Sequence, residues 1–502
     1  MRWIAPADPL PTWRRWWASV APATGQVKPD ELVWHRLAGA WLAISSRTGG
    51  WAVFEAAERA GFAGITHAER SGRWRPVVEA AWRRGMITIG GQSVYDARQH
   101  REAVEATRDY YTLVLLLNQG CNLVCTYCYL GHAAPAPHRA MAADLARKAV
   151  LGALEQPWET ILADFGEIAV AGAALRELLP WARAAAEARG KTLRASVQTN
   201  GTTLDDELAD FLARHDVAVG ISLDGPRQLH DAARVFRTGA GSYDRAVAAV
   251  RRCGERGLPV HLIATISRHN IGHPCDVVAE LAAHRPRSTL LKPVLPEGEA
   301  GAAWTRHAIT ESEYAGFMRA AIQRADHDGA DMLDQSAGKF LLRLIGDKSG
   351  WRDSCTSRAC GSGRSLHVVA ADGSVHSCPR FVSGDRAQAG AATGDAGHRR
   401  LLPITAVGPA MPGPLPDLLP ETLRAAPPSC AGCAWLGSCG GGCTLVAQSG
   451  SPAVPMPDPH CVAYQAMHEE LFATVITSFF AGRHRESTAF KGAAPQVAYA
   501  RA

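Results

Sequence analysis

Hydrophobic residues are distributed in two different ways along the chain, and the change falls near residue 105. From residue 110 onward, nearly continuous apolar runs alternate with segments whose apolar positions recur at helical spacing. The runs predict strands that are buried on both faces, as in a parallel sheet. There are six of them: YYTLVLLLN (110–118), ETILADF (159–165), TLRASVQTN (192–200), VAVGISLDG (217–225), PVHLIATIS (259–267) and STLLKPVL (288–295).

The segments between these runs have the amphipathic pattern of helices. They include ALRELLPWARAAAEARG (174–190), DDELADFLARH (205–215), YDRAVAAVRRCGERG (243–257) and DVVAELAAH (276–284). Six strand–helix repeats are fewer than the eight of a complete βα barrel, which typically needs about 250 residues. The pattern therefore predicts an α/β fold in which residues 105–300 form an open, partial (β/α)6 barrel.

Residues 1–100 are predicted to form a separate, small α/β domain. LVWHRL (32–37) and AWLAIS (40–45) have the pattern of short strands, and MITIG (86–90) that of a last one. GWAVFEAAERAG (50–61) and WRPVVEAAWRRG (74–85) have the pattern of helices that end at glycine. This order resembles the winged-helix modules called RiPP recognition elements, which bind leader peptides. An ordinary capping domain is the alternative.

The rest of the chain is predicted to have three parts. Residues 301–350 form a helical bridge, in which 310–346 have a helical pattern. Residues 351–482 form a cysteine-rich domain, with an irregular Gly-, Ala- and Pro-rich excursion at 382–429 and a closing helix, VAYQAMHEELFATVITSFFAG (462–482). Residues 483–502 form a flexible tail.

Composition excludes several classes of protein. The net charge of +5, from 53 basic and 48 acidic residues, is too small to predict nucleic-acid binding. The N-terminus lacks the features of a signal peptide, and no run of about 18 apolar residues predicts a membrane span. We therefore expect a cytoplasmic protein, in which stable disulfides are rare. Its thirteen cysteines, an odd number, suggest metal binding instead.

Three of these cysteines lie on one short loop, GCNLVCTYCYLGH (120–132), which contains Cys121, Cys125 and Cys128. A disulfide uses two thiols, and a closed zinc site usually takes four ligands. Three thiolates on a cubane [4Fe–4S] cluster would leave one iron open. The loop follows the first predicted strand, so it lies at the edge of a βα barrel where active sites gather.

The C-x3-C-x2-C spacing, with Tyr127 before the last cysteine, resembles the radical S-adenosylmethionine (SAM) superfamily. The resemblance implies that Cys121, Cys125 and Cys128 are catalytic and bind a [4Fe–4S] cluster whose open iron chelates SAM. In that family an electron from the cluster cleaves SAM to a 5′-deoxyadenosyl radical, which takes a hydrogen atom from the substrate. A zinc site remains the alternative for these thiols.

Three further stretches resemble that superfamily in the same order. DFGEIAV (164–170) stands where the family has Gly-Gly-Glu-Pro: Gly166 and Glu167 match, and Phe165 and Ile168 depart. QTNGTTL resembles a Thr-Asn-Gly turn, and ISLDGPRQLHDAARV resembles a Ser-Leu-Asp-Gly stretch with a downstream arginine. The resemblance implies that Ser222 and Arg234 bind the SAM carboxylate. The full set of implied SAM-binding residues is Tyr127, Gly166, Glu167, Asn200, Ser222 and Arg234.

Eight more cysteines lie in the C-terminal third, in a pattern that includes C-x2-C-x5-C-x3-C. The pattern resembles the SPASM domain, a C-terminal extension of radical SAM peptide maturases. The resemblance implies two auxiliary [4Fe–4S] clusters, hence three in all. One would be held by Cys355, Cys360, Cys378 and Cys443, and the other by Cys430, Cys433, Cys439 and Cys461. Two zinc sites of four cysteines each are the alternative.

The resemblance implies a maturase that abstracts hydrogen from a residue of a peptide or protein substrate, giving a thioether or carbon–carbon crosslink or a related oxidation. Formylglycine formation or epimerisation is the alternative within the class. Pro379 argues against formylglycine formation, because the maturases that make it have an Asp base at that place. The implied partners are a substrate with a leader peptide and an electron donor such as flavodoxin or ferredoxin. Other classes that remain are a multi-cluster electron-transfer protein and a zinc-stabilised binding module.

Overall fold

The computed structural model describes only part of the chain, and every structural statement below concerns that part. The described residues are 27–29, 31–37, 40–46, 50–54, 59, 62, 81–82, 85–92, 110–132, 140–296, 298–327, 334–344, 361–379, 382, 428–443, 458 and 460–480. The chain divides into two compact units. One consists of Arg108–Ser336 and Gly361–Pro420, and the other of Met1–Thr107, Ala337–Cys360 and Glu421–Ala502.

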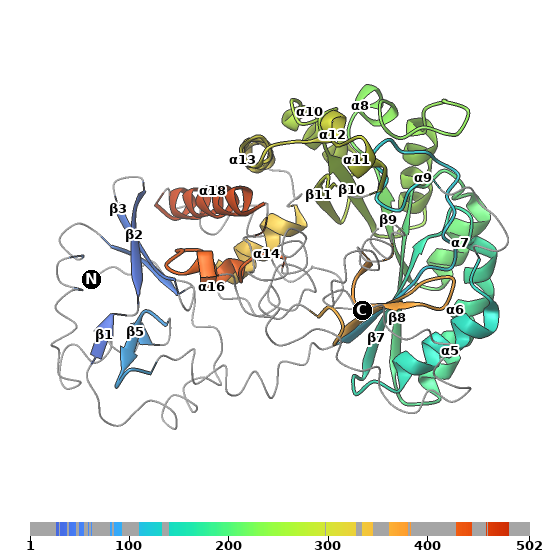
Figure 1. Cartoon of the computed structure of the whole chain (residues 1–502), viewed down its shortest axis with the longest axis horizontal. Coiled ribbons are helices and arrows are strands. Elements are labelled where there is room, and N and C mark those ends of the chain that lie inside the picture. The colour runs from blue at the N-terminus through green and yellow to red at the C-terminus, as the bar shows by residue number, and fades with distance from the viewer. Residues whose placement is uncertain are drawn as a thin grey trace. The chain divides into compact units, whose positions relative to one another are not determined.

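The first unit is built on a sheet whose strand order, within the described residues, is β11-β10-β9-β8-β7-β6-β12-β13 (Figure 1). The six predicted strands are confirmed as neighbouring parallel strands of this sheet: β6 (Tyr110–Leu115), β7 (Thr160–Glu167), β8 (Thr192–Thr199), β9 (Val217–Ser222), β10 (Val260–Ile266) and β11 (Ser288–Pro293). Each neighbouring pair among these six is hydrogen-bonded in parallel register. Their carboxyl ends therefore share one edge, where side chains from different strands can meet.

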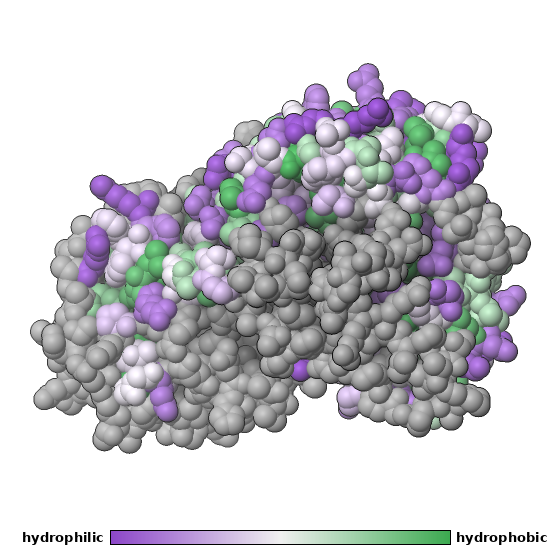
Figure 2. Space-filling model, viewed as in Figure 1, coloured by the Kyte–Doolittle hydropathy of each residue, from purple (hydrophilic) through white to green (hydrophobic). Residues whose placement is uncertain are grey.

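Helices cover the outer face of this sheet (Figure 1). The predicted helices are confirmed, and the connection between β6 and β7 adds another. The helices are α5 (Ala143–Leu154), α6 (Gly172–Glu187), α7 (Asp206–Arg214), α9 (Tyr243–Glu255), α10 (Pro274–Ala283) and α13 (Glu311–His327), with shorter α8 (Arg227–Asp231), α11 (Gly298–Ala302) and α12 (Trp304–His307). The exposed surface over α10, α12 and α13 is mostly hydrophilic, with hydrophobic residues in small patches (Figure 2).

Helix α7 illustrates how the sequence forms these elements. Asp205 is its N-cap, and the Asp205 carboxylate accepts a hydrogen bond from Leu208 N at 2.8 Å. This bond satisfies one of the amide groups that the first turn of a helix leaves unpaired. Leu208, Phe211 and Leu212, at spacings of three and one, are buried. The apolar positions of the amphipathic pattern therefore form the helix face that covers the sheet.

A late segment of the chain extends the same sheet beyond β6. Strand β12 (Leu366–Val369) pairs in parallel with β6, and β13 (Val375–His376) pairs antiparallel with β12. The side chains of β12 are all buried, and His367 Nδ1 lies 2.7 Å from the hydroxyl oxygen of Tyr111. These residues belong to the stretch 351–482 that the sequence assigned to a cysteine-rich domain, yet they join the barrel unit. The domain boundaries stay predictions.

The second unit contains two small antiparallel sheets near the N-terminus. Strands β2 (Leu32–Leu37), β3 (Ala40–Ser45) and β4 (Trp51–Phe54) form one, and β1 (Val27–Pro29) pairs with β5 (Ile87–Ile89) in the other. The prediction of a helix over 50–61 is wrong at its start, because β4 pairs with β3 and buries Trp51 and Phe54. Aromatic and branched side chains favour this strand over the helix. The predicted helix over 74–85 lies mostly outside the described residues.

Helices from the C-terminal part pack against the N-terminal sheet within this unit. Helices α14 (Gln335–Leu344) and α18 (Cys461–Phe480) are predicted by their apolar patterns and are present, and a short helix, α16 (Leu436–Cys439), lies between the cysteines. The Trp435 ring stacks on His35 of β2, with 5.5 Å between ring centroids, and Trp51 of β4 contacts Phe472. In the described part of the chain, no helix is long and apolar enough to cross a membrane.

Candidate active site

The loop that follows β6 holds three cysteines and is fixed at both of its sides. Val124 N donates to Val235 O at 2.8 Å, and Thr126 N donates to Ala233 O at 2.9 Å, so the loop is hydrogen-bonded to the chain that follows α8. Cys128 N donates to Cys125 O at 3.0 Å, which turns the chain between the second and third cysteine. Apolar packing adds to these bonds: Cys121, Cys125 and Cys128 belong to one hydrophobic cluster with Leu123, Tyr127, Ala233, Val294 and Ala300.

The environment of these thiols disfavours the free thiolate. Burial raises the pKa of Cys121 to about 11 and that of Cys125 to about 12, and it also raises the pKa of Cys128. The Glu167 carboxylate raises the pKa of Cys121 further. A bound cationic metal centre would relieve this cost, because thiolate is the form that binds metal. Three thiols on one loop, one of them buried and two half-buried, therefore fit a metal cluster.

A cubane cluster suits three cysteines of one loop, because each thiolate binds its own iron and the sulfur atoms need not converge on one point. Among the described residues, no group of three His, Cys, Asp or Glu side chains is placed to hold one metal ion.

Glu167 lies at the carboxyl end of β7 and ties it to β8. Its Oε1 accepts hydrogen bonds from Ala169 N at 2.7 Å and Thr199 Oγ1 at 2.9 Å, and its Oε2 accepts one from Asn200 N at 2.8 Å. Gly166 has φ +58°, and a Cβ there would lie 3.0 Å from Leu116 Cδ2. Glycine thus gives the backbone the turn that places Glu167 beside the cysteine loop.

Asn200, at the end of β8, reaches the cysteine loop directly. Its Nδ2 lies 3.5 Å from Cys121 Sγ and donates to Asn122 Oδ1 at 2.9 Å. Its Oδ1 accepts from Thr202 N at 2.9 Å, and Asn122 Nδ2 donates to Thr202 Oγ1 at 2.8 Å. Sequence reasoning found Asn200 but missed Asn122 and Thr202. Their positions in the sequence could have identified both residues, because Asn122 stands between the cysteines and Thr202 directly follows the Asn-Gly turn.

Ser222 ends β9 and faces another residue that the sequence analysis missed. Gln198 of β8 places its Nε2 3.5 Å from Ser222 Oγ. A Cβ at Gly220 would overlap the Gln198 amide, so glycine at that position leaves room for this side chain. Gln198 lies inside the barrel because β8 alternates its side chains between the two faces of the sheet. Nothing in the local sequence distinguishes it from an ordinary polar strand residue.

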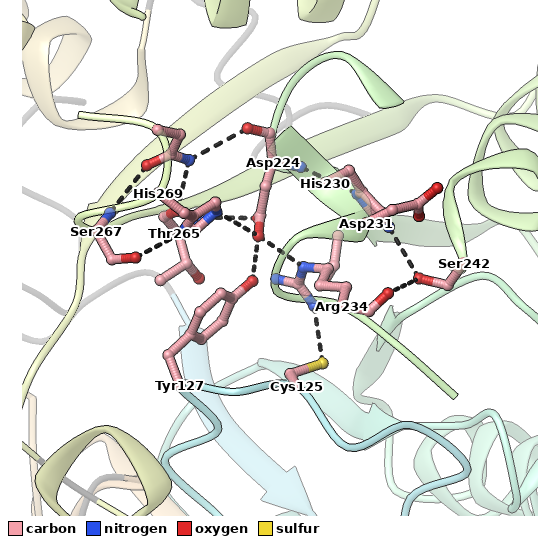
Figure 3. Close-up of polar contacts among 12 residues, drawn as sticks. Cys125, Tyr127, Asp224, His230, Asp231, Arg234, Ser242, Thr265, Ser267 and His269 are labelled. Atoms are coloured by element: carbon pink, nitrogen blue, oxygen red, sulfur yellow. Dashed lines mark hydrogen bonds and ion pairs between the residues drawn. The ribbon is translucent and has the colours of Figure 1, made fainter. Parts of the chain in front are cut away.

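Arg234 lies beside Cys125 and is paired with a buried acid (Figure 3). Its Nε is 3.1 Å from Asp224 Oδ2, and its Nη1 is 4.0 Å from Cys125 Sγ. Burial by itself raises the pKa of Asp224, but the Arg234 guanidinium and the His269 ring outweigh it and hold that pKa below its ordinary value. Sequence reasoning missed Asp224, although it sits in the Ser-Leu-Asp-Gly stretch that drew attention to Ser222.

The Tyr127 side chain is buried against Asp224 and Arg234. Its hydroxyl donates to Asp224 Oδ2, and its ring stacks on His269 with 5.7 Å between centroids. The Arg234 guanidinium lies 5.4 Å from the centre of the Tyr127 ring. The structure therefore brings Tyr127 and Arg234 together near Cys125, and Gly166, Glu167 and Asn200 together near Cys121. Ser222 lies on the strand between these two groups.

Helix α11 holds the far end of the cysteine loop. Glu299 N donates to Cys128 O at 2.9 Å, and the Glu299 carboxylate accepts from His132 N at 3.1 Å. His132 Nε2 donates in turn to Cys125 O at 2.8 Å. The residue before Glu299, Gly298, has φ +53°, and a Cβ there would overlap the carbonyl oxygens of Cys128 and Tyr129. The close approach of α11 to the loop thus requires glycine.

We expect Gly298→Ala to loosen the cysteine loop. The new methyl group must push α11 away from the loop carbonyls, and a strained backbone of this kind costs about 1–3 kcal/mol. Thermal unfolding followed by circular dichroism should show a lower midpoint, and the reconstituted variant should lose iron faster to a chelator. Gly254→Ala is the matched control: Gly254 lies in α9 with nothing within 4 Å of a new Cβ, so its midpoint should not fall. Equal unfolding midpoints and equal rates of iron loss in the two variants would contradict a role of Gly298 in holding α11 against the cysteine loop.

A second group of cysteines lines a pocket in the other unit. The pocket has a volume of about 370 Å³, part of it open to solvent, and is lined by Cys430, Cys433, Cys439 and Cys461 together with Trp435, Leu436, Gly441, Gly442, Asp458, Tyr464 and Gln465. These four cysteines are the set that the sequence assigned to one auxiliary cluster. Gly440, Gly441 and Gly442 have φ values of 77°, 92° and 77°, which lets the chain turn tightly around the pocket.

The other predicted auxiliary set is described only in part. Cys443 does not line this pocket, and its N donates to Asp458 Oδ2 at 2.6 Å. Cys378 follows β13 in the barrel unit, whereas Cys443 belongs to the other unit. Cys355 and Cys360 lie outside the described residues. The assignment of these four cysteines to one cluster stays a prediction.

Comparison with known proteins identifies the barrel. Residues 115–281 match the model of the radical SAM superfamily. The chain is 24% identical over 307 residues to a serine-type anaerobic sulfatase-maturating enzyme of Bacteroides thetaiotaomicron, a match covering 54% of this chain and 70% of that protein. It is 35% identical over 161 residues to an Fe-coproporphyrin III synthase of Methanosarcina barkeri. This match covers 31% of this chain and 37% of that protein.

A solved structure shows the same fold. Native anSMEcpe with bound AdoMet superposes with a TM-score of 0.58 at 19% identity, over 73% of this chain and 98% of that one. At this identity the likeness concerns the fold alone. The superfamily match runs from the last residue of β6 into α10, so it includes the cysteine loop and the polar side chains that reach it from β7, β8 and the chain after β9, whereas Glu299 of α11 lies beyond it. The chain therefore contains a radical SAM enzyme domain.

Proposed function

We propose that this enzyme is a peptide or protein maturase, which removes hydrogen from a residue of its substrate and forms a thioether or carbon–carbon crosslink or a related oxidation. The observation that carries the proposal is the cysteine loop at the carboxyl end of β6, with Glu167 and Asn200 turned toward it from β7 and β8. The names of several relatives, which are sulfatase-maturating enzymes, support a peptide or protein as the substrate.

A radical SAM domain uses a [4Fe–4S] cluster and SAM. We assign the cluster to Cys121, Cys125 and Cys128, and the surroundings of SAM to Tyr127, Gly166, Glu167, Asn200, Ser222 and Arg234. When bound, this pair supplies the 5′-deoxyadenosyl radical that takes hydrogen from the substrate. The chain holds the site in shape: Asn200 fixes the Cys121 side of the loop, and Glu167 joins the strand ends beneath it. Cys125 is buried, so its thiolate would be shielded from water when the cluster is bound.

We further propose two auxiliary [4Fe–4S] clusters, three clusters in all. The pocket lined by Cys430, Cys433, Cys439 and Cys461 supports the first, because four thiols around one cavity match the ligand count of a closed cluster. Cys355, Cys360, Cys378 and Cys443 are the proposed ligands of the second. Clusters with four cysteine ligands leave no iron open for substrate. We propose that they transfer electrons to or from the substrate, with flavodoxin or ferredoxin as the external donor.

The N-terminal sheet is the proposed binding site of a leader peptide. In the described part of this unit, β2 lies at an edge of the three-stranded sheet, and an extended peptide can add to a sheet as a further strand at such an edge. The packing of His35 on Trp435 and of Trp51 on Phe472 places this sheet against the segment that carries the auxiliary cysteines. A leader peptide bound there would therefore be held next to the auxiliary site.

Formylglycine formation is the second candidate reaction. The sulfatase-maturating relatives favour it. Pro379 speaks against it, because proline follows Cys378 and has no group that accepts a proton. A sulfatase peptide offered to the enzyme distinguishes the two candidates. An aldehyde product that reacts with a hydrazide probe would support formylglycine formation, and an unmodified peptide would support a different substrate.

The proposal is tested by anaerobic reconstitution of the full-length chain. We expect a brown protein with about twelve irons, as three cubane clusters require. Dithionite and SAM should then release 5′-deoxyadenosine. Brown protein that releases none would point to an electron-transfer protein, and colourless protein with zinc would point to a binding module.

A further inference from the structure

A buried arginine lies directly against one cysteine of the cluster loop, and a buried acid lies against that arginine. Asp224, which follows β9, is fully buried, and Arg234, which follows α8, is 8% exposed. Figure 3 shows the two side chains facing each other above Cys125, with Tyr127 beside them. A buried ion pair is a poor source of stability, because removing both charges from water costs about as much as their attraction returns. Its presence here calls for another role.

The Asp224 carboxylate is fixed from several sides. Thr265 N donates to its Oδ1 at 3.0 Å, and the Tyr127 hydroxyl donates to its Oδ2. Arg234 Nε lies 3.1 Å from the same Oδ2. These partners come from β10, from the chain after α8 and from the cysteine loop itself. The acid therefore has one rigid position, and it holds the guanidinium in one orientation.

The Arg234 backbone is held by a second chain of hydrogen bonds (Figure 3). Asp224 N donates to His230 Nδ1 at 3.3 Å, which leaves His230 Nε2 to donate to Ser242 Oγ at 2.9 Å. Ser242 Oγ donates in turn to Arg234 O at 2.8 Å. Burial lowers the pKa of His230 to about 4, so the ring stays neutral and keeps this pattern at physiological pH. Both ends of Arg234 are thus anchored to the same acid residue.

The consequence is a permanent positive charge beside a cluster ligand. Arg234 Nη1 lies 4.0 Å from Cys125 Sγ, a long N–H···S contact in which charge matters more than hydrogen bonding. The carboxylate of Asp224 binds the Nε side of the guanidinium. Reduction adds an electron to an iron–sulfur cluster, and a cation next to a sulfur ligand stabilises the added negative charge. Such a cation raises the reduction potential of the cluster.

We propose that Asp224 and Arg234 form a positioning pair that sets the reduction potential of the cluster on Cys121, Cys125 and Cys128. Arg234 supplies the charge, and Asp224 fixes it against Cys125. The inference rests on the proposed function, which places a cluster on these cysteines. It gives Arg234 a role at the cluster sulfur that is separate from any contact with SAM.

The test is a redox titration of full-length, anaerobically reconstituted protein without SAM, followed by electron paramagnetic resonance. The signal to follow is the one missing from Cys125→Ala protein. At the wild-type midpoint, Arg234→Gln should lower the ratio of reduced to oxidised cluster by about tenfold, which is about 59 mV for a one-electron couple. Arg234→Lys keeps the positive charge but loses the planar guanidinium that Asp224 orients. It should therefore lower the ratio of reduced to oxidised cluster less, by about threefold.

Arg227→Gln is the matched control. Arg227 is paired with Asp244 on the surface and has no described contact with the cysteine loop, so its loss should leave the ratio unchanged. An unchanged ratio in Arg234→Gln would overturn the inference. If that variant holds no iron, Arg234→Lys decides, and an unchanged ratio there would overturn it equally.

The positioning role of Asp224 has its own test. In an Asp224→Asn background the guanidinium loses its anchor, so adding Arg234→Gln should change the ratio by less than about threefold. A full tenfold change in that background would show that Arg234 acts without Asp224. The proposed function fails separately: it is wrong if wild-type protein releases no 5′-deoxyadenosine. The inference alone is wrong if wild-type protein cleaves SAM while Arg234→Gln titrates like wild type.

Discussion

Replacement of Cys125 by alanine is expected to abolish the release of 5′-deoxyadenosine and to remove about four of about twelve irons. Cys125 is the most deeply buried of the three loop cysteines, and the loop around it is bonded to the chain after α8. The two other thiols of this loop, Cys121 and Cys128, are themselves assigned as ligands, so neither can replace it. Because two thiolates cannot hold a cubane against loss of iron, we expect the rate to fall by roughly three orders of magnitude or more.

Cys275→Ala is the control for this prediction. Cys275 is exposed on α10, far along the chain from the cysteine loop, and should tolerate alanine without loss of iron or activity. Iron analysis and chromatography of the SAM products measure both effects. Retention of all the iron and of SAM cleavage in Cys125→Ala would show that this cysteine is not a cluster ligand.

Replacement of Cys433 by alanine should separate SAM cleavage from substrate modification. Cys433 lines the pocket of four cysteines in the unit that does not contain the barrel, so its loss should remove about four irons while the cluster on the barrel loop remains. We expect 5′-deoxyadenosine to form still, and the modified peptide to fall by roughly two orders of magnitude. Electron transfer through the auxiliary cluster explains the difference.

Iron content, 5′-deoxyadenosine and modified peptide are measured in the same reaction, again beside Cys275→Ala. Unchanged iron in Cys433→Ala would contradict the assignment of the pocket to a cluster. If Cys433→Ala loses iron but still gives a normal yield of modified peptide, the electron-transfer role is contradicted. The auxiliary cluster would then have a structural role.

Much of the barrel could be predicted because its signals are local. A strand buried on both faces must be apolar along its whole length, and the six parallel strands of the sheet all follow runs of that kind. The cysteine loop was equally visible, since Cys121, Cys125 and Cys128 lie close together in sequence. Asn200 and Glu167 were found through short motifs at strand ends, where a parallel sheet gathers its functional side chains.

Features that depend on distant pairing could not be predicted. Strand β12 is a four-residue apolar run whose partner, β6, lies some 250 residues earlier in the chain, as the register of Leu366 with Thr112 shows. Trp51–Phe54 was assigned to the start of a helix but forms a strand, because β3 offers it a partner. Asp224 lies in the predicted strand run 217–225 and received no role, and only the fold shows that Tyr127, Thr265 and Arg234 converge on its carboxylate.

The central claim is that three cysteines of one loop hold a cluster with one iron left for SAM. The most direct measurement is electron–nuclear double resonance of dithionite-reduced protein with SAM labelled by ¹⁷O in the carboxylate and ¹⁵N in the amino group. Our account predicts coupling of both nuclei to the cluster, and its absence from Cys125→Ala protein. A reduced cluster whose spectrum is unchanged by SAM, with no coupling to either label, would contradict it.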